Sequence, residues 1–225
     1  MNFYNANLKD NPLIVNSHGP WLVDKNGNHL FDCWLGAGTL LYGHAHSDFL
    51  NTTKMLPELH LPEQCKNLIN KLVDFKVGSL GIQTSGSSAI TRACRIARAL
   101  TSRRLVALIG EFWHGSDDEF LFRHNHELLS AGLNIKAGEN YLWFETISDF
   151  LDYPNLSDFA AILVEPFQGS NPGNNVVSEL LDSNKREFLR KENILIIFDE
   201  IITGFRESYG SSLISRKCHP DIVVF

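Results

Sequence analysis

The sequence predicts an α/β fold in which a mainly parallel sheet is covered by helices on both faces. The first observation is a set of continuous apolar runs of strand length, at residues 104–110, 160–166, 193–200 and 221–225. Such runs are typical of parallel strands that are buried on both faces. The second observation is a set of segments with helical apolar spacing, at residues 64–75, 87–100 and 178–192. Strands that alternate with helices form parallel sheets with right-handed crossovers.

A small β-rich segment precedes this pattern. Asn26-Gly27 separates two alternating apolar runs and predicts a β-hairpin. In the helical segments, the apolar positions define the faces that we expect to be buried. For residues 64–75 these positions are Leu68, Ile69, Leu72 and Phe75. For residues 87–100 they are Ala89, Ala93, Ile96, Ala97 and Leu100.

Composition limits the class of protein. The chain has 225 residues, with 20 lysines and arginines against 26 aspartates and glutamates, and a net charge of −6. This length suits one large domain, alone or with a small appendage. The acidic balance argues against nucleic-acid binding, for which a basic surplus is expected. The sequence has no CxxC pair, no visible signal peptide and no apolar run of the ~18 residues that a membrane span needs, so a cytoplasmic protein is expected.

Ligands of parallel sheets bind at the carboxyl ends of the strands, so the polar residues near those ends are the candidates. The segment TSGSSA, from Thr84 to Ala89, opens the helix predicted at 87–100. Ser85 or Ser87 can cap this helix, and Gly86 allows the backbone to approach a ligand. The free N–H groups and the helix dipole then favour a phosphate. An ordinary serine cap explains the same residues without a ligand.

Two adjacent carboxylates, Asp199 and Glu200, follow the most apolar run. On a strand, Asp199 and Ile201 point to one side and Glu200 to the other. Asp199 is therefore a candidate partner for a protonated heterocyclic nitrogen, with Ile201 packed on the same ring. The alternatives are a solvated loop start and a magnesium-binding pair.

Aromatic and polar residues follow two other apolar runs. Trp113 offers a flat face to a planar cofactor and His114 a polar contact beside it, although simple packing also explains an aromatic residue there. Glu165 and Gln168 are expected at the same edge of the sheet. We predict no metal site from the closely spaced histidines, because no third ligand follows at a recognisable spacing; these pairs are His44 with His46 and His124 with His126.

Taken in this order, the motifs resemble those of the class III aminotransferases, which are pyridoxal-phosphate enzymes of fold type I, and especially the glutamate-1-semialdehyde aminomutase-like group. DExxTGFR after an apolar strand is the most specific element. The resemblance covers almost the whole chain, through DKNGNHLFD (24–32), GHAH (43–46), SGSSA, WHG, VEPFQG, FDEIITGFR and HPDIVVF (219–225).

The resemblance implies pyridoxal 5′-phosphate as the cofactor. The implied cofactor-binding residues are Ser85, Gly86, Ser87, Trp113, His114, Asp199 and Ile201. The first three would bind the phosphate, and Asp199 would keep the pyridine nitrogen protonated. Trp113, where the family usually has Tyr or Phe, would stack on the ring with His114 beside it, and Ile201 would pack on the other face. Supporting roles are implied for Glu165, Gln168 and Glu200.

The resemblance also implies a domain division and two departures from the family. Residues 1–55 would contribute to a small domain, and residues 56–225 would form the cofactor-binding large domain, truncated at its C-terminal end. Ser88 stands where the family usually has a glutamate. The family's Schiff-base lysine would follow the last apolar run, and no lysine of this chain follows a motif strand, so we expect no catalytic residue in it.

We therefore expect the N-terminal part of a class III aminotransferase or aminomutase, inactive without a lysine-bearing second part. The complete reaction would move an amino group between an amino acid or amine and a carbonyl compound. The expected partners are that small-molecule substrate and either a second copy in a homodimer or a second chain with the lysine and the small domain. The alternative is a non-catalytic remnant or interaction protein; a magnesium-dependent enzyme is a weaker one.

Overall fold

The structure is a computed structural model, which divides into two compact units, residues 1–57 and 58–225. The described residues are 12–36, 38–47, 61–72, 76–122, 132–133, 135–167, 176–206, 210–211 and 218–225.

The first unit contains a small antiparallel sheet of strands β1 (Ile14–His18), β2 (Trp21–Asp24) and β3 (His29–Phe31), in that order. The predicted hairpin is confirmed, because β2 pairs with β3 across the Asn26-Gly27 turn. Gly27 has a φ of +83°, a conformation that favours glycine. Asp24 Oδ1 fixes the turn by accepting hydrogen bonds from the N–H groups of Asn26 and Asn28, each at 2.8 Å.

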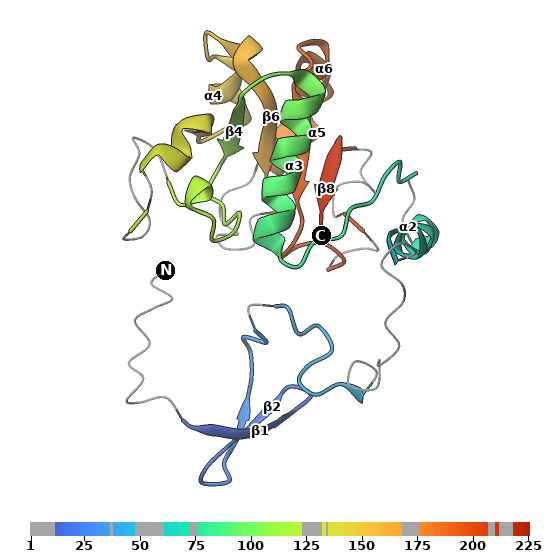
Figure 1. The fold of residues 1–225 in the computed structure, drawn as a ribbon, viewed down its shortest axis with the longest axis vertical. Helices are drawn as coiled ribbons and strands as arrows, with labels where there is room; N and C mark the ends of the chain where they lie inside the picture. Colours follow the sequence, from blue (N-terminus) through green and yellow to red (C-terminus); the bar gives the residue numbers. More distant parts are fainter. Residues whose placement is uncertain are drawn as a thin grey trace. The chain divides into compact units, whose positions relative to one another are not determined.

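The second unit is built on a five-stranded parallel sheet (Figure 1). Its order is β5-β4-β6-β7-β8. The bounds are β4 (Leu105–Ile109), β5 (Tyr141–Phe144), β6 (Phe159–Val164), β7 (Leu195–Asp199) and β8 (Ile222–Val224). Each predicted apolar run coincides with one of these strands, and β6 begins one residue before its run. The fifth strand, β5, was not among the predicted runs.

Helices cover both faces of this sheet, as predicted. Helix α3 (Gly86–Thr101) lies across one face, in contact with β6, β7 and β8 (Figure 1). The opposite face carries α4 (Ile147–Leu151), α5 (Val177–Leu181) and α6 (Ser183–Lys191). The strand side chains alternate between the two layers, so that Val106 and Leu108 join the cluster with α3 whereas Ala107 and Ile109 join the other. Both clusters are apolar, and the sheet is thereby buried on both sides.

Two helical predictions are corrected. In α3, Ile96 is 42% and Leu100 is 69% exposed, and the buried stripe consists of Ile90, Ala93, Cys94 and Ala97. Residues spaced i, i+3, i+4 and i+7 lie along one side of a helix. The predicted face is rotated about the helix axis relative to the stripe that is buried. The segment predicted as one helix at 178–192 is two, because Asp182 ends α5 and its carboxylate accepts the Asn184 N–H to cap α6.

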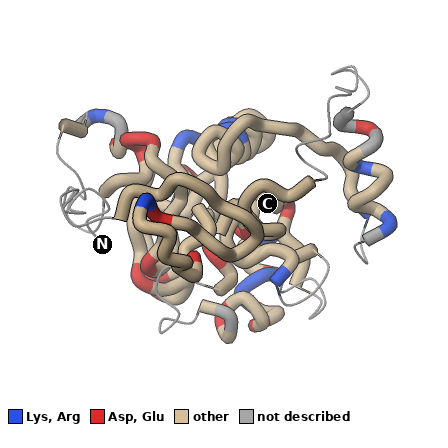
Figure 2. Tube along the Cα trace, turned by 90° about the horizontal axis from the view of Figure 1, so that it is seen from below, with Lys and Arg blue, Asp and Glu red and all other residues tan. Residues whose placement is uncertain are grey.

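The helix predicted at 64–75 is α2 (Leu61–Leu72), in which Leu68 is exposed. The predicted apolar residue Phe75 lies outside the described residues. None of the helices in the described ranges is long and apolar enough to cross a membrane. Lysines and arginines are interspersed with aspartates and glutamates along the described trace (Figure 2).

Candidate functional site

The N-terminus of α3 is capped by two serines that hydrogen-bond to each other's backbone N–H groups. Ser85 Oγ accepts a hydrogen bond from the Ser88 N–H at 3.2 Å, and the Ser85 N–H donates to Ser88 Oγ at 3.3 Å. This is a capping box, and Ser88 fills in it the position at which glutamate is common. The N–H groups of Gly86 and Ser87 have no acceptor among the described residues. These groups lie at the positive end of a 16-residue helix, a position that favours an anion.

The loop after β4 is held against this helix start. The Ser116 N–H donates to Ser87 Oγ at 3.0 Å. Gly115 has a φ of +109°, and a Cβ there would lie 2.4 Å from Ser87 Oγ and 2.9 Å from Ser87 Cα. Only glycine satisfies both the backbone conformation and the close approach. The glycine of the WHG motif is thereby explained by geometry.

A buried histidine and a buried aspartate form the centre of the site. His114 is 1% and Asp199 is 3% exposed, and His114 Nδ1 lies 2.7 Å from Asp199 Oδ2. The other oxygen, Asp199 Oδ1, accepts the Ile201 N–H at 3.1 Å. The His114 ring stacks on Phe112 with a centroid separation of 4.4 Å and an interplanar angle of 10°. His114 Nε2 is buried without a hydrogen-bond partner in the described part of the chain.

Glu165 joins the same cluster from the end of β6. Its Oε1 accepts the Trp113 N–H at 2.9 Å, which fixes the backbone between the end of β4 and His114. Trp113 is about two-fifths exposed, so one part of its ring is open to solvent. The ends of three adjacent strands therefore meet at one place, as the predicted sheet edge requires.

Ile201 connects this cluster to the helix start. A Cβ built on Gly86 would lie 2.8 Å from Ile201 Cδ1. The Ile201 side chain is therefore packed on the first turn of α3, while its N–H binds Asp199. Ser85, Gly86, Ser87, Trp113, His114, Asp199 and Ile201 are thus gathered around the β4 and β7 ends and the start of α3.

Glu200 has a different environment from Asp199. It is 1% exposed, and it accepts hydrogen bonds from Thr203 Oγ1 at 2.6 Å and from Ser211 Oγ. These contacts fix the turn that follows β7. Glu200 is therefore a structural acid, and its separation from Asp199 follows from strand alternation. Gln168 and the pair His124 and His126 lie outside the described residues.

The sequence predicted His114, Glu165 and Asp199 near strand ends, but not that they form a cluster of possible metal ligands. One ligand atom each of His114, Glu165 and Asp199 lies within 4.8 Å of the others. Histidines close together in the chain are the usual signal of a metal site, whereas these three residues are separated by long segments. His44, one of the histidines considered, instead pairs through Nε2 with Asp32 Oδ2 at 2.6 Å.

Burial raises the pKa of two further groups, Cys94 in α3 and Tyr141 in β5. Burial raises the pKa of the Cys94 thiol to about 12. Burial also raises the pKa of Tyr141, whose hydroxyl donates to Glu119 Oε2 at 2.9 Å. Both groups are therefore protonated at neutral pH and belong to the core.

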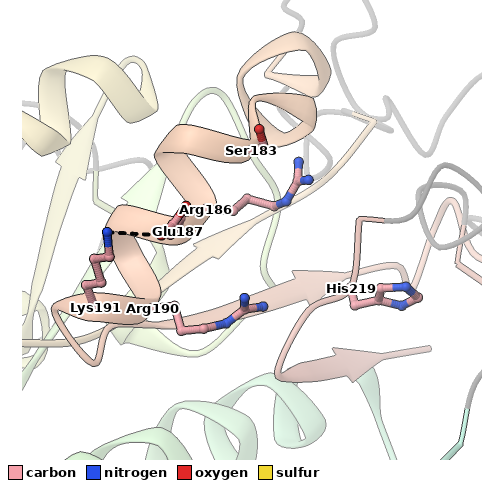
Figure 3. A pocket seen from close by; sticks show the side chains of 6 residues that line it. All are labelled: Ser183, Arg186, Glu187, Arg190, Lys191 and His219. Atoms are coloured by element: carbon pink, nitrogen blue, oxygen red, sulfur yellow. Dashed lines mark ion pairs between the residues drawn. The ribbon is translucent and has the colours of Figure 1, made fainter.

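A cavity of about 640 Å³ lies elsewhere, beside α6 and the loop that precedes β8. Figure 3 shows its lining, in which Lys191 pairs with Glu187 at 3.0 Å. None of its lining residues belongs to the strand-end cluster; they are Ser183, Arg186, Glu187, Arg190, Lys191 and His219.

The chain resembles solved structures of transaminases and of an aminomutase in fold. The chain resembles an omega-transaminase from Sphaerobacter thermophilus with a TM-score of 0.77 at 20% identity, covering 94% of this chain and 53% of that one. It resembles a glutamate-1-semialdehyde aminomutase from Pseudomonas aeruginosa PAO1 with a TM-score of 0.73 at 22% identity, covering 94% and 49%. The predicted fold, the large-domain sheet of pyridoxal-phosphate-dependent transferases of fold type I, is confirmed.

The chain is also similar in sequence to curated proteins of one named activity. Glutamate-1-semialdehyde 2,1-aminomutases from Sulfurihydrogenibium sp. (strain YO3AOP1) and Thermoplasma volcanium are each 28% identical to it, over 94% and 96% of the chain. No family model matches. The chain spans about half the length of these relatives, 53% and 55%. In sequence and fold, the chain is thus similar to the N-terminal half of glutamate-1-semialdehyde aminomutases and transaminases.

Proposed function

We propose that this chain binds pyridoxal 5′-phosphate at the ends of β4, β6 and β7, and that it supplies the cofactor-binding part of an aminotransferase or aminomutase. The observation that carries the proposal is the contact of Gly86 with Ile201. Through it, a donor set for a phosphate and a buried carboxylate lie next to each other. The cofactor has a phosphate and a basic ring nitrogen, so both of its charged groups match the residues present.

The residues divide the binding between them. The N–H groups of Gly86 and Ser87 hold the phosphate, and Ser85 keeps the helix turn in place. Asp199 accepts the N–H of the protonated ring nitrogen, and Trp113 and Ile201 pack on the ring. When bound, the cofactor supplies an electron-withdrawing ring that stabilises negative charge next to the amino carbon.

Electrostatics favour a cationic ring at Asp199. A buried carboxylate is costly unless it is paired and hydrogen-bonded. In the described part of the chain, its side-chain hydrogen-bond partner is His114 Nδ1. A ring N–H⁺ adds a cationic partner in a place from which water is largely excluded, where a charge-assisted hydrogen bond is strong.

The complete reaction, in this proposal, uses a lysine from outside the described residues. The hydrogen bonds that define the cluster involve no lysine among those residues, and Lys185, for example, pairs with Glu179 on the opposite face of the sheet. A second polypeptide, or another part of a longer protein, would provide the lysine. The substrates would be a small amino compound and a carbonyl compound, handled by a cytoplasmic homodimer or two-chain complex.

Binding of pyridoxamine 5′-phosphate to the full chain tests the proposal, with Trp fluorescence as the readout. This probe has no aldehyde, so it cannot react with surface lysines. We expect saturable binding, and at least a tenfold loss of affinity in Asp199→Asn, because a charge-assisted hydrogen bond contributes about 1.5–3 kcal/mol. Asp158→Asn is the matched control, since this carboxylate is exposed and distant from the cluster in the fold.

Two results would count against the proposal. A folded wild-type chain, verified by circular dichroism, that binds no probe at millimolar concentration excludes the cofactor site. Equal losses in Asp199→Asn and Asp158→Asn exclude the assignment of Asp199. For the complete reaction, mixing with a lysine-bearing C-terminal part of a relative is expected to yield amino transfer, and a mixture without activity favours a non-catalytic binding protein.

A further inference from the structure

We propose that the cavity beside α6 is a second binding site, which takes a small molecule that carries a phosphate group. Its volume of about 640 Å³ is within the range of about 300–1,000 Å³ that is typical of small-molecule sites. We call it the basic cavity, because three of its six lining residues are lysine or arginine. The inference goes beyond the proposed function, since no residue of the strand-end cluster takes part in it.

The basic cavity lies at the edge of the sheet opposite to the strand-end cluster. A smaller adjoining cavity of about 150 Å³ shares Arg186, Arg190 and His219 with it. That smaller cavity is also lined by residues 193–196, which lead into β7, and by Asp221, which comes directly before β8. Both spaces are therefore at the amino ends of these strands, whereas the strand-end cluster is at the carboxyl ends. A ligand in the basic cavity does not compete with a ligand at the cluster.

The excess positive charge of the basic cavity comes from two arginines. Arg186 and Arg190 are four residues apart in α6, and so they lie on the same face of the helix. Figure 3 shows both side chains extending from the helix toward the side on which His219 lies. Lys191 instead pairs with Glu187 at 3.0 Å, and these two charges offset each other. Two guanidinium groups and an imidazole thus line the space between α6 and the loop that precedes β8.

The carboxylates near these arginines are bonded to other groups. The Glu187 carboxylate holds Lys191. Asp221 Oδ2 accepts the Ile196 N–H at 2.8 Å. Within the described part of the chain, the Arg190 side chain makes no hydrogen bond and no ion pair. A guanidinium has five N–H donors in a planar fork that matches the oxygens of a phosphate, so the donors of Arg190 are available to such a ligand.

Arg186 is held in place before any ligand binds. Its guanidinium donates a hydrogen bond to the Leu180 carbonyl oxygen, which also accepts the Cys218 thiol at 3.2 Å. Cys218 directly precedes His219, so this shared acceptor joins α6 to the loop on the other side of the basic cavity. The remaining donors of the guanidinium are already oriented. Binding to a group that is ordered in advance costs less conformational entropy.

A structural explanation accounts for only a part of this charge. Arg190 and Lys191 lie in the last turn of α6, where a cation interacts favourably with the helix dipole. Arg186 lies one turn earlier, and His219 belongs to another segment of the chain. The chain as a whole has a net charge of −6, so the charge of the two arginines is opposite in sign to that of the chain. Charge-assisted hydrogen bonds from arginine to phosphate are among the strongest in proteins, which favours a phosphate as the ligand.

Calorimetric titration of the full chain with glycerol 3-phosphate tests the inference, and glycerol is the matched ligand without the phosphate. We expect saturable binding of the ester and no binding of glycerol. Arg190→Gln is expected to lose about tenfold in affinity, because charge-assisted hydrogen bonds are removed. The matched control is Arg95→Gln, which removes an exposed charge from α3 on the other face of the sheet. This control is expected to change the affinity by less than about twofold, since a distant surface charge is screened by salt.

A variant on the other side of the basic cavity shows whether both sides bind one ligand. His219→Phe keeps a planar ring and removes the ring nitrogens, and it is expected to lose about threefold in affinity, the loss typical of a single hydrogen bond. Circular dichroism and urea unfolding verify that each variant is folded. His219→Phe also serves as the second variant if Arg190→Gln does not fold.

Three results overturn the inference: a wild-type chain that binds no glycerol 3-phosphate at millimolar concentration, equal affinities of Arg190→Gln and Arg95→Gln, or an unchanged affinity of His219→Phe. The proposed function is tested separately by the binding of pyridoxamine 5′-phosphate, which Arg190→Gln is expected to leave unchanged. A chain that binds glycerol 3-phosphate through Arg190, but no pyridoxamine 5′-phosphate, supports this inference and excludes the proposed function. The reverse result overturns this inference and leaves the proposed function intact.

Discussion

Replacing Gly115 by alanine is expected to affect stability and ligand binding together. Its φ of +109° is a conformation that L-residues rarely adopt, and such strain costs about 1–3 kcal/mol. The new Cβ would also lie 2.9 Å from Ser87 Cα, which is backbone and cannot rotate away. Overpacking of this kind costs about 1–3 kcal/mol more. We therefore expect Gly115→Ala to lower the free energy of unfolding by about 2–6 kcal/mol.

Two matched glycines separate the causes. Gly132 has a φ of +82° with nothing within 4 Å of its Cβ position, so Gly132→Ala has the strain without the overlap. Gly78 has neither, and Gly78→Ala is expected to change stability by less than about 0.5 kcal/mol. The difference between Gly115→Ala and Gly132→Ala then measures the overlap with α3, about 1–3 kcal/mol.

The assay is urea unfolding followed by circular dichroism, with pyridoxamine 5′-phosphate binding measured on the same samples. Gly115→Ala is expected to weaken binding as well, because the overlap displaces Ser87 from the phosphate donor set. Gly132→Ala is expected to leave binding unchanged. Equal unfolding free energies for these two variants, with equal affinities, would refute the close packing of the WHG loop on α3.

Two further predictions concern α3. Ser85→Ala is expected to lower the free energy of unfolding by about 1 kcal/mol because the N-cap is lost, whereas Ser85→Gly is expected to lower it by only a few tenths of a kcal/mol. Urea unfolding measures both changes, with exposed Ser157→Ala as the control. Equal losses of stability in the alanine and glycine variants contradict the prediction. Burial raises the pKa of the Cys94 thiol from 9.0 to about 12. Between pH 9 and pH 12 the unfolded state therefore binds fewer protons than the folded state. The free energy of unfolding falls by about 1.4 kcal/mol per pH unit as the pH rises above 9. Urea unfolding at pH 8 and pH 10 is expected to show a smaller fall in Cys94→Ala than in exposed Cys33→Ala, and identical falls contradict it.

The strands that are buried on both faces were predictable, because burial requires apolar residues at every position. Strands β4 and β6 are buried at every position, so each is a continuous apolar run that the sequence displays directly. Strand β5 lies at the edge of the sheet, and three of its four residues are only partly buried. Ile96 and Leu100 misled the prediction of the α3 face, because apolar side chains also occur on exposed surfaces.

The site was predictable as a set of strand ends but not as a set of bonds. The position of Asp199 after its strand indicated the edge at which it lies. That its carboxylate pairs with His114, 85 residues earlier in the chain, depends on the sheet order and on the rotamers of both residues. The Ser88 contribution to the capping box was equally hidden, since serine has no fixed role at that helical position.

The long sequence separation within the cluster has a consequence for folding. The Trp113–Glu165 bond spans 52 residues and the His114–Asp199 bond spans 85. Contacts of this kind form late and slow the folding of parallel sheets. A ligand that binds only the assembled cluster therefore binds only the completed sheet, and by mass action it raises the thermal midpoint of the whole unit in proportion to the logarithm of its concentration. Ligand binding at the cluster therefore indicates that the sheet is completely folded, because no isolated hairpin or helix of this unit contains the cluster.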